Sequence, residues 1–156
     1  MDYAPARGMR SLKTRQLHAL YWIATLLFIL PQGWAATQYL VGAPRMTQAI
    51  TQLGYPEYLM AILGVAKLLG IAAIVTGISP TLKEWAYAGF TFDVLGAFAS
   101  HLGAGDSLPI ALVPLGFGVV QMVSFFAWRK LRERTVPRLQ RPAHRFRPRE
   151  LAQTAA

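Results

Sequence analysis

Four stretches of this chain are long enough and apolar enough to cross a lipid bilayer. They are residues 18–39, 57–78, 84–103 and 109–128. About 20 apolar residues in a helix match the roughly 30 Å of the hydrocarbon core, where a helix satisfies its own backbone hydrogen bonds. Only 15% of the residues are charged, against about 25% in soluble proteins. We therefore predict an all-α fold, a four-helix transmembrane bundle that runs up-down-up-down.

The basic residues gather at the two ends of the chain. Four precede the first stretch and nine follow the last, with only Arg45, Lys67 and Lys83 between them. Connections rich in Lys and Arg stay on the cytoplasmic side. Both termini are therefore expected in the cytoplasm, as an even number of spans requires, and the expected location is a bacterial-type cytoplasmic (inner) membrane.

Three regions follow from this pattern. Residues 1–16 form a basic cytoplasmic N-terminus, 17–130 the membrane domain, and 131–156 an Arg- and Pro-rich tail that we expect to be disordered. Such a tail beside a membrane span is expected to contact anionic lipid headgroups. Nucleic acid is not expected as a partner, because lipid is the nearer polyanion.

Two apolar stretches each carry one charged residue near their midpoint, Lys67 and Asp93. Each lies thirteen positions from Pro80, which separates the stretches, so both reach the same depth in a helical hairpin, about 20 Å from its turn. A lone charge at the bilayer centre costs about 2.5 kcal/mol or more, so such charges are usually paired. We predict that the two side chains meet. The pair is either a structural salt bridge or a centre that handles protons or polarises a ligand, and the residues leave both open.

Asp93 lies on a helix face of small residues. At 100° per residue, the side chains within about 60° of it are Ala86, Gly89, Gly96, Ala97 and Ser100. Bulky residues, Tyr87 and Leu95 among them, lie on the opposite side. Small residues let membrane helices approach closely, so we expect the small face to meet another helix and the bulky face to meet lipid. Gly64 and Gly70 of the preceding stretch are expected to serve helix packing in the same way.

The first stretch allows a second interpretation. A basic start followed by an apolar run is also typical of a signal peptide, and Gly33-Trp34-Ala35 resembles a cleavage site. We favour retention of the span, because Tyr21 and Tyr39 are spaced as interface aromatics at its two ends.

The two connections on the outer side carry further features. In the longer one, residues 46–53 are expected to form a short helix along the membrane surface. The shorter one runs from His101 to Asp106 through glycines, and we expect these two side chains to lie together at the outer end of the bundle. A histidine there is either a satisfied surface residue or a proton relay between water and a buried site.

Several cofactor classes do not fit this sequence. There is no cysteine, which excludes iron–sulfur clusters and covalently attached haem. A haem held by two histidines needs both at one depth, but His18 lies at the inner end of the first stretch and His101 at the outer end of the third. Asp, Glu and His do not cluster as they do in di-iron bundles. We expect no haem and no metal ion.

Taken together, these features resemble the DoxX-like family of small four-helix integral membrane proteins. The resemblance covers about residues 21–128 and is strongest in LGYPEYLMAILGVAKLLG and LKEWAYAGFTFDVLGAFASHLGAGD. The family takes its name from a subunit of a thiosulfate:quinone oxidoreductase, and other members look like accessory subunits of redox or detoxification complexes. The resemblance implies catalytic roles for Lys67, Asp93 and His101, and cofactor binding by Glu84, Trp85 and Tyr87 at the inner end of the third helix.

Three functions stay open at this point. The one we favour is an accessory subunit that binds a lipophilic ligand such as a quinone beside a soluble redox partner, with Lys67 and Asp93 polarising the ligand's oxygens. The second is a non-catalytic scaffold in which the pair only fixes helix register. The third is a homo-oligomeric transporter, for which four short-looped helices offer little room. Whether the chain catalyses a reaction is also open, because it has no redox group of its own.

Overall fold

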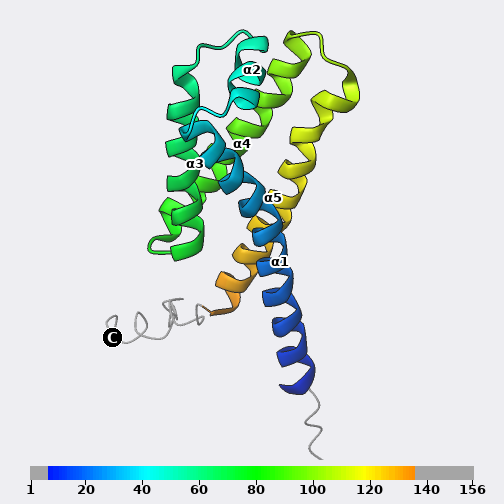
Figure 1. The fold of residues 1–156 in the computed structure, drawn as a ribbon. Helices are drawn as coiled ribbons and strands as arrows, with labels where there is room; N and C mark the ends of the chain where they lie inside the picture. The colour runs from blue at the N-terminus through cyan, green and yellow to red at the C-terminus, as the bar shows by residue number, and fades with distance from the viewer. Residues whose placement is uncertain (1–6, 136–156) are drawn as a thin grey trace, which may run out of the picture.

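The protein is built from α-helices joined by short connections (Figure 1). The computed structural model describes residues 7–135, and within that range it contains five helices and no β-strand. They are α1 (Arg7–Leu40), α2 (Pro44–Gln52), α3 (Tyr58–Thr76), α4 (Pro80–Gly103) and α5 (Leu108–Thr135). The predicted all-α fold is confirmed, and α2 corresponds to the short helix predicted in the longer connection.

Two helices extend beyond the predicted spans. α1 begins at Arg7 rather than residue 18, and α5 continues to Thr135 rather than ending at residue 128. Hydropathy marks only the apolar part of a helix, whereas Arg, Lys and Gln are good helix formers that continue it into water. Residues 131–135, predicted as part of a disordered tail, are therefore helical, and the tail from 136 onward lies outside the described residues.

Three of the described helices contain segments long and apolar enough to cross a membrane. These segments are Lys13–Leu40, Tyr58–Thr76 and Leu108–Arg134. α4 contains no 18-residue segment that meets the same criterion, because polar side chains such as Asp93 and His101 interrupt it. It is nevertheless 24 residues long, which corresponds to about 36 Å of helix, and it packs against both α3 and α5.

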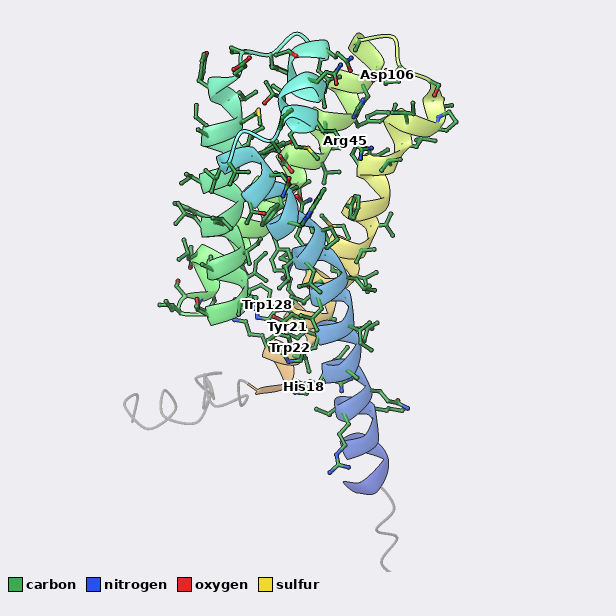
Figure 2. All side chains as sticks on the ribbon, in the orientation of Figure 1. His18, Tyr21, Trp22, Arg45, Asp106 and Trp128 are labelled. Carbon is green, nitrogen blue, oxygen red and sulfur yellow. The ribbon has the colours of Figure 1, made fainter. Side chains whose placement is uncertain are left out.

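The four long helices form a closed ring of contacts, in which α1 and α4 each pack against both α3 and α5. Gly77 ends α3 with a φ of 59°, a conformation that favours glycine, and Ser79 caps α4 by accepting a hydrogen bond from the Leu82 N–H. Figure 1 shows this turn at one end of the bundle and α2 with the α4–α5 connection at the other, here termed the loop end. Figure 2 places Asp106 at the loop end and Trp128 toward the opposite end.

The core lies where the helices of this ring meet. Phe28 of α1 and Phe90 of α4 are buried, with their rings edge to face and their centroids 4.9 Å apart. Gly64 allows α1 and α3 to approach, because a Cβ there would lie 3.1 Å from an α1 carbonyl oxygen. At Gly70 a Cβ would lie 2.8 Å from the Phe90 ring. The predicted packing role of both glycines is confirmed.

Candidate functional site

Lys67 of α3 and Asp93 of α4 form an ion pair inside the bundle. The distance from Lys67 Nζ to Asp93 Oδ2 is 2.5 Å, and the side chains are 8% and 21% exposed. Lys67 Nζ also donates a hydrogen bond of 2.7 Å to Oε1 of Gln32, on α1. The predicted contact is therefore confirmed, and Gln32 is a third member of the site that sequence analysis did not identify.

A cavity of about 660 Å³ lies beside this ion pair, between α3 and α4. We term it the α3–α4 cavity. Its wall includes the whole predicted small face of α4, namely Ala86, Gly89, Gly96, Ala97 and Ser100. Apart from the neighbouring residues and backbone of α4 itself, no described atom lies within 4 Å of a Cβ built on Gly89 or Gly96. At Gly89 and Gly96 the expectation that this face meets another helix closely is therefore wrong, because the cavity lies there, whereas Ala86 of the same face packs against the buried core.

The chemistry of the cavity wall is mostly apolar, with a few polar groups. An ammonium group has three N–H donors, and Asp93 and Gln32 accept two of those on Lys67. The third N–H, the second carboxylate oxygen of Asp93 and the Tyr39 hydroxyl remain as groups that can bond to a molecule in the cavity. A largely apolar pocket of 300–1,000 Å³ with few polar groups is typical of a small-molecule site.

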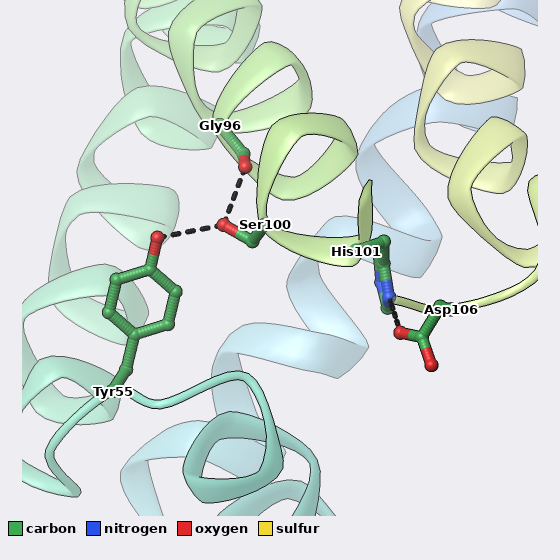
Figure 3. Close-up of polar contacts among 5 residues, drawn as sticks. All are labelled: Tyr55, Gly96, Ser100, His101 and Asp106. Atoms are coloured by element: carbon green, nitrogen blue, oxygen red, sulfur yellow. Dashed lines mark hydrogen bonds and ion pairs between the residues drawn. The ribbon is translucent and has the colours of Figure 1, made fainter. Parts of the chain in front are cut away.

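His101 lies at the loop end of the cavity, not beside the ion pair. Its Nδ1 is 2.7 Å from Asp106 Oδ2 (Figure 3), so the predicted pairing of these residues is confirmed. His101 lies eight positions after Asp93 on α4, which corresponds to about 12 Å along the helix. Within the described residues, no group of three or more His, Asp and Glu side chains could hold a metal ion.

Three residues near the start of α4, for which the family resemblance implies cofactor binding, lie in three different surroundings. Trp85 lines the α3–α4 cavity, whereas Glu84 lies on the surface and forms an ion pair of 3.2 Å with Arg132. Tyr87 is only 2% exposed, and its hydroxyl is 2.7 Å from Ser124 Oγ of α5. The expectation that Tyr87 faces lipid is wrong, because α5 packs on that side of α4.

Lys83 is a second buried cation, which sequence analysis did not identify. It is 5% exposed and donates hydrogen bonds of 2.7 Å to the Tyr21 hydroxyl and to the Ile74 carbonyl oxygen. Its Nζ lies 5.0 Å and 5.2 Å from the ring centroids of Tyr21 and Trp128. Tyr21 is thus a core residue rather than an interface aromatic. No local pattern indicates this burial, because a lysine in the first turn of a helix is usually exposed.

A chain of buried hydroxyl groups joins α4, α5 and α1. Tyr87 is hydrogen-bonded to Ser124, and Ser124 to Thr25 at 2.6 Å. Gln121 Nε2 donates to the Tyr87 carbonyl oxygen and to Thr91 Oγ1. Apart from Tyr87, sequence analysis gave these residues no role, although polar residues in apolar stretches generally indicate interior hydrogen bonds.

Comparison with known proteins gives one finding. The model of the DoxX-like family matches residues 23–124, which is 102 of the 156 residues and includes all members of the ion-pair site. No match was found among curated proteins or among solved structures. The match covers more than half of the chain, and the chain therefore belongs to the DoxX-like family.

Proposed function

We propose that this protein is a multi-pass protein of a bacterial-type cytoplasmic membrane that binds a lipophilic, carbonyl-bearing molecule, such as a quinone, in the α3–α4 cavity. It serves as an accessory subunit beside a soluble partner in a redox or detoxification complex. The observation that carries the proposal is the buried Lys67–Asp93 ion pair on the wall of a mostly apolar cavity of about 660 Å³. Family membership and the three long apolar helices support the membrane location.

The proposed topology has α1, α3, α4 and α5 crossing in alternating directions, with both termini in the cytoplasm. α4 can cross because Lys67 compensates the charge of Asp93. Reporter fusions at Ile78 and Gly105, one enzyme active only outside and one fluorescent protein active only inside, test this crossing. The two junctions should report opposite sides, and the same side at both would contradict it.

The proposed ligand chemistry follows from the polar groups on the cavity wall. The remaining Lys67 N–H can donate to a carbonyl oxygen, and the second Asp93 oxygen can accept from a hydroxyl group. The apolar lining suits a ring and a hydrocarbon chain. Trp85 and Phe92 are 72% and 76% exposed yet also line the cavity, so the cavity opens along α4 toward the surrounding lipid. A lipophilic molecule can therefore reach it from within the bilayer.

A binding titration tests the ligand directly. The purified full-length protein is titrated in nanodiscs with a short-chain quinone, and quenching of tryptophan fluorescence is followed, because Trp85 lies on the cavity wall. A hydrogen bond to a charged group contributes about 1.5–3 kcal/mol, so Lys67→Met and Asp93→Asn should each weaken binding by about tenfold or more. Lys130→Met and Glu133→Gln make the same changes outside the cavity and should bind as the unsubstituted chain does. Equal binding by all four variants would contradict the proposal.

A second candidate is a scaffold, in which the ion pair only holds α3 to α4. The observation that favours it is that Lys67 joins three helices, through its ion pair with Asp93 of α4 and its hydrogen bond to Gln32 of α1. The double variant Lys67→Met/Asp93→Leu distinguishes the two functions, because apolar replacement of a buried ion pair often preserves folding. A scaffold keeps its cellular function in this variant. Loss of function in a well-folded double variant argues against a scaffold.

A further inference from the structure

We propose that α2 is a hinged flap that closes the loop end of the α3–α4 cavity, and that a hydrogen bond between Tyr55 and Ser100 holds it shut (Figure 3). The inference deepens the proposed function, because it concerns access to the same cavity. The cavity then has two openings, one along α4 toward lipid and one toward the aqueous phase that opens only when α2 moves.

The apolar side of α2 forms part of the cavity wall. Ala49, Ile50 and the following Leu53 line the cavity, and Ile50 is 6% exposed. Gln48 and Gln52 are exposed on the opposite side. The helix therefore covers the end of the cavity with its apolar side and presents its polar side to water.

Glycines at both ends of α2 are suited to act as hinges. Gly42 and Gly54 have φ values of 63° and 84°, which side chains rarely adopt. No atom of the described chain lies within 4 Å of a Cβ built on either glycine. The backbone can therefore change conformation at these two points without displacing packed side chains.

The latch is a hydrogen bond of 2.7 Å between Tyr55 and Ser100 of α4. Tyr55 follows α2 and is tied to it, because its N–H donates a hydrogen bond of 3.1 Å to the Ile50 carbonyl oxygen. Ser100 Oγ donates its hydrogen to the Gly96 carbonyl oxygen, so Tyr55 is the donor to Ser100. On the same turn of α4, the His101–Asp106 pair ties the helix end to the following connection and so steadies the acceptor. A typical hydrogen bond of this kind shifts an open-to-closed equilibrium by about fivefold.

The absence of cysteine allows a direct test. Ala97→Cys places the chain's one thiol on the cavity wall, and the full-length variant in nanodiscs is treated with a charged thiol reagent that does not enter lipid. Adding Tyr55→Phe or Ser100→Ala should raise the labelling rate about fivefold. Combining them should raise it no further, because both remove the same bond. Tyr58→Phe, which removes an exposed hydroxyl outside the cavity wall, should leave the rate unchanged.

Three results would overturn the proposal. The first is an unchanged labelling rate with both latch substitutions, and the second is a much faster rate in the double variant than in either single one. The third is that the latch substitutions raise the labelling rate equally when the cysteine is at Val113 instead, an exposed site on α5. The last would mean general loosening of the bundle rather than opening of the flap. Labelling requires no ligand, so a failure of quinone binding leaves this test intact, and a failure of the flap leaves the binding test intact.

Discussion

Replacing Asp93 with Asn removes the charge that compensates Lys67 while preserving size and an acceptor oxygen. Lys67 remains almost fully buried, with Gln32 Oε1 as its other acceptor. Removing one partner of a buried ion pair costs about 3–5 kcal/mol. Asp93 is 21% exposed, and Asn still accepts a hydrogen bond, so the lower end applies. We expect Asp93→Asn to lower the free energy of unfolding by about 3 kcal/mol.

Two further variants separate the charge from the packing. Lys67→Met leaves an unpaired Asp93, whose side chain is more exposed than that of Lys67, so we expect a smaller loss, about 1–2 kcal/mol. In Lys67→Met/Asp93→Leu neither charge remains, and the free energy of unfolding should return to within about 1 kcal/mol of the unsubstituted value. The resulting double-mutant cycle gives the coupling between the two side chains directly.

The assay is equilibrium unfolding in mixed micelles, followed by circular dichroism. Glu84→Gln is the control, because it breaks the exposed ion pair with Arg132 and should cost less than about 1 kcal/mol. A loss below about 0.5 kcal/mol for Asp93→Asn would show that the charges do not stabilise each other. The same reasoning would be refuted if the double variant lost as much free energy of unfolding as the two single variants together.

Two further predictions concern the bundle around the site. Lys83→Met should lower the free energy of unfolding by about 2–3 kcal/mol, because the Tyr21 hydroxyl and the Ile74 carbonyl oxygen lose their buried donor. The same unfolding assay measures it, and a loss under about 0.5 kcal/mol would count against a structural role for Lys83. Gly64→Ala should cost about 1–3 kcal/mol, because its Cβ would press on α1. Gly116→Ala should be neutral or stabilising by up to about 1 kcal/mol, because a Cβ built on Gly116 contacts no side chain or other helix within 4 Å among the described residues. Equal changes in the free energy of unfolding for the two glycine variants would contradict the packing argument.

Features that lie within one helical hairpin could be predicted from the sequence. Lys67 and Asp93 meet because equal counts from Pro80 give equal depth when a tight turn joins two helices. The residues of the small face share one side of α4 because each residue advances a helix by 100°, and the structure places all of them on the cavity wall. The short α2 helix also followed from its local pattern.

Features that depend on neighbouring helices could not be predicted. Gln32 approaches Lys67 only because α1 packs against α3. Tyr87 is buried rather than lipid-facing because α5 covers that side of α4. Lys83 is buried because α1 and α5 supply the aromatic rings around it. Whether the small face of α4 met a helix or a cavity depended on the position of α3 relative to it.

The sequence by itself therefore determined the helices and the depth of the two central charges. Backbone hydrogen bonding and the 3.6-residue repeat act within a single element, so they can be read without knowing its neighbours. The tertiary structure alone decided which side chains became buried partners and where a cavity remained. Burial and hydrogen-bond partners depend on the positions of other helices, and no local pattern of residues specifies those positions.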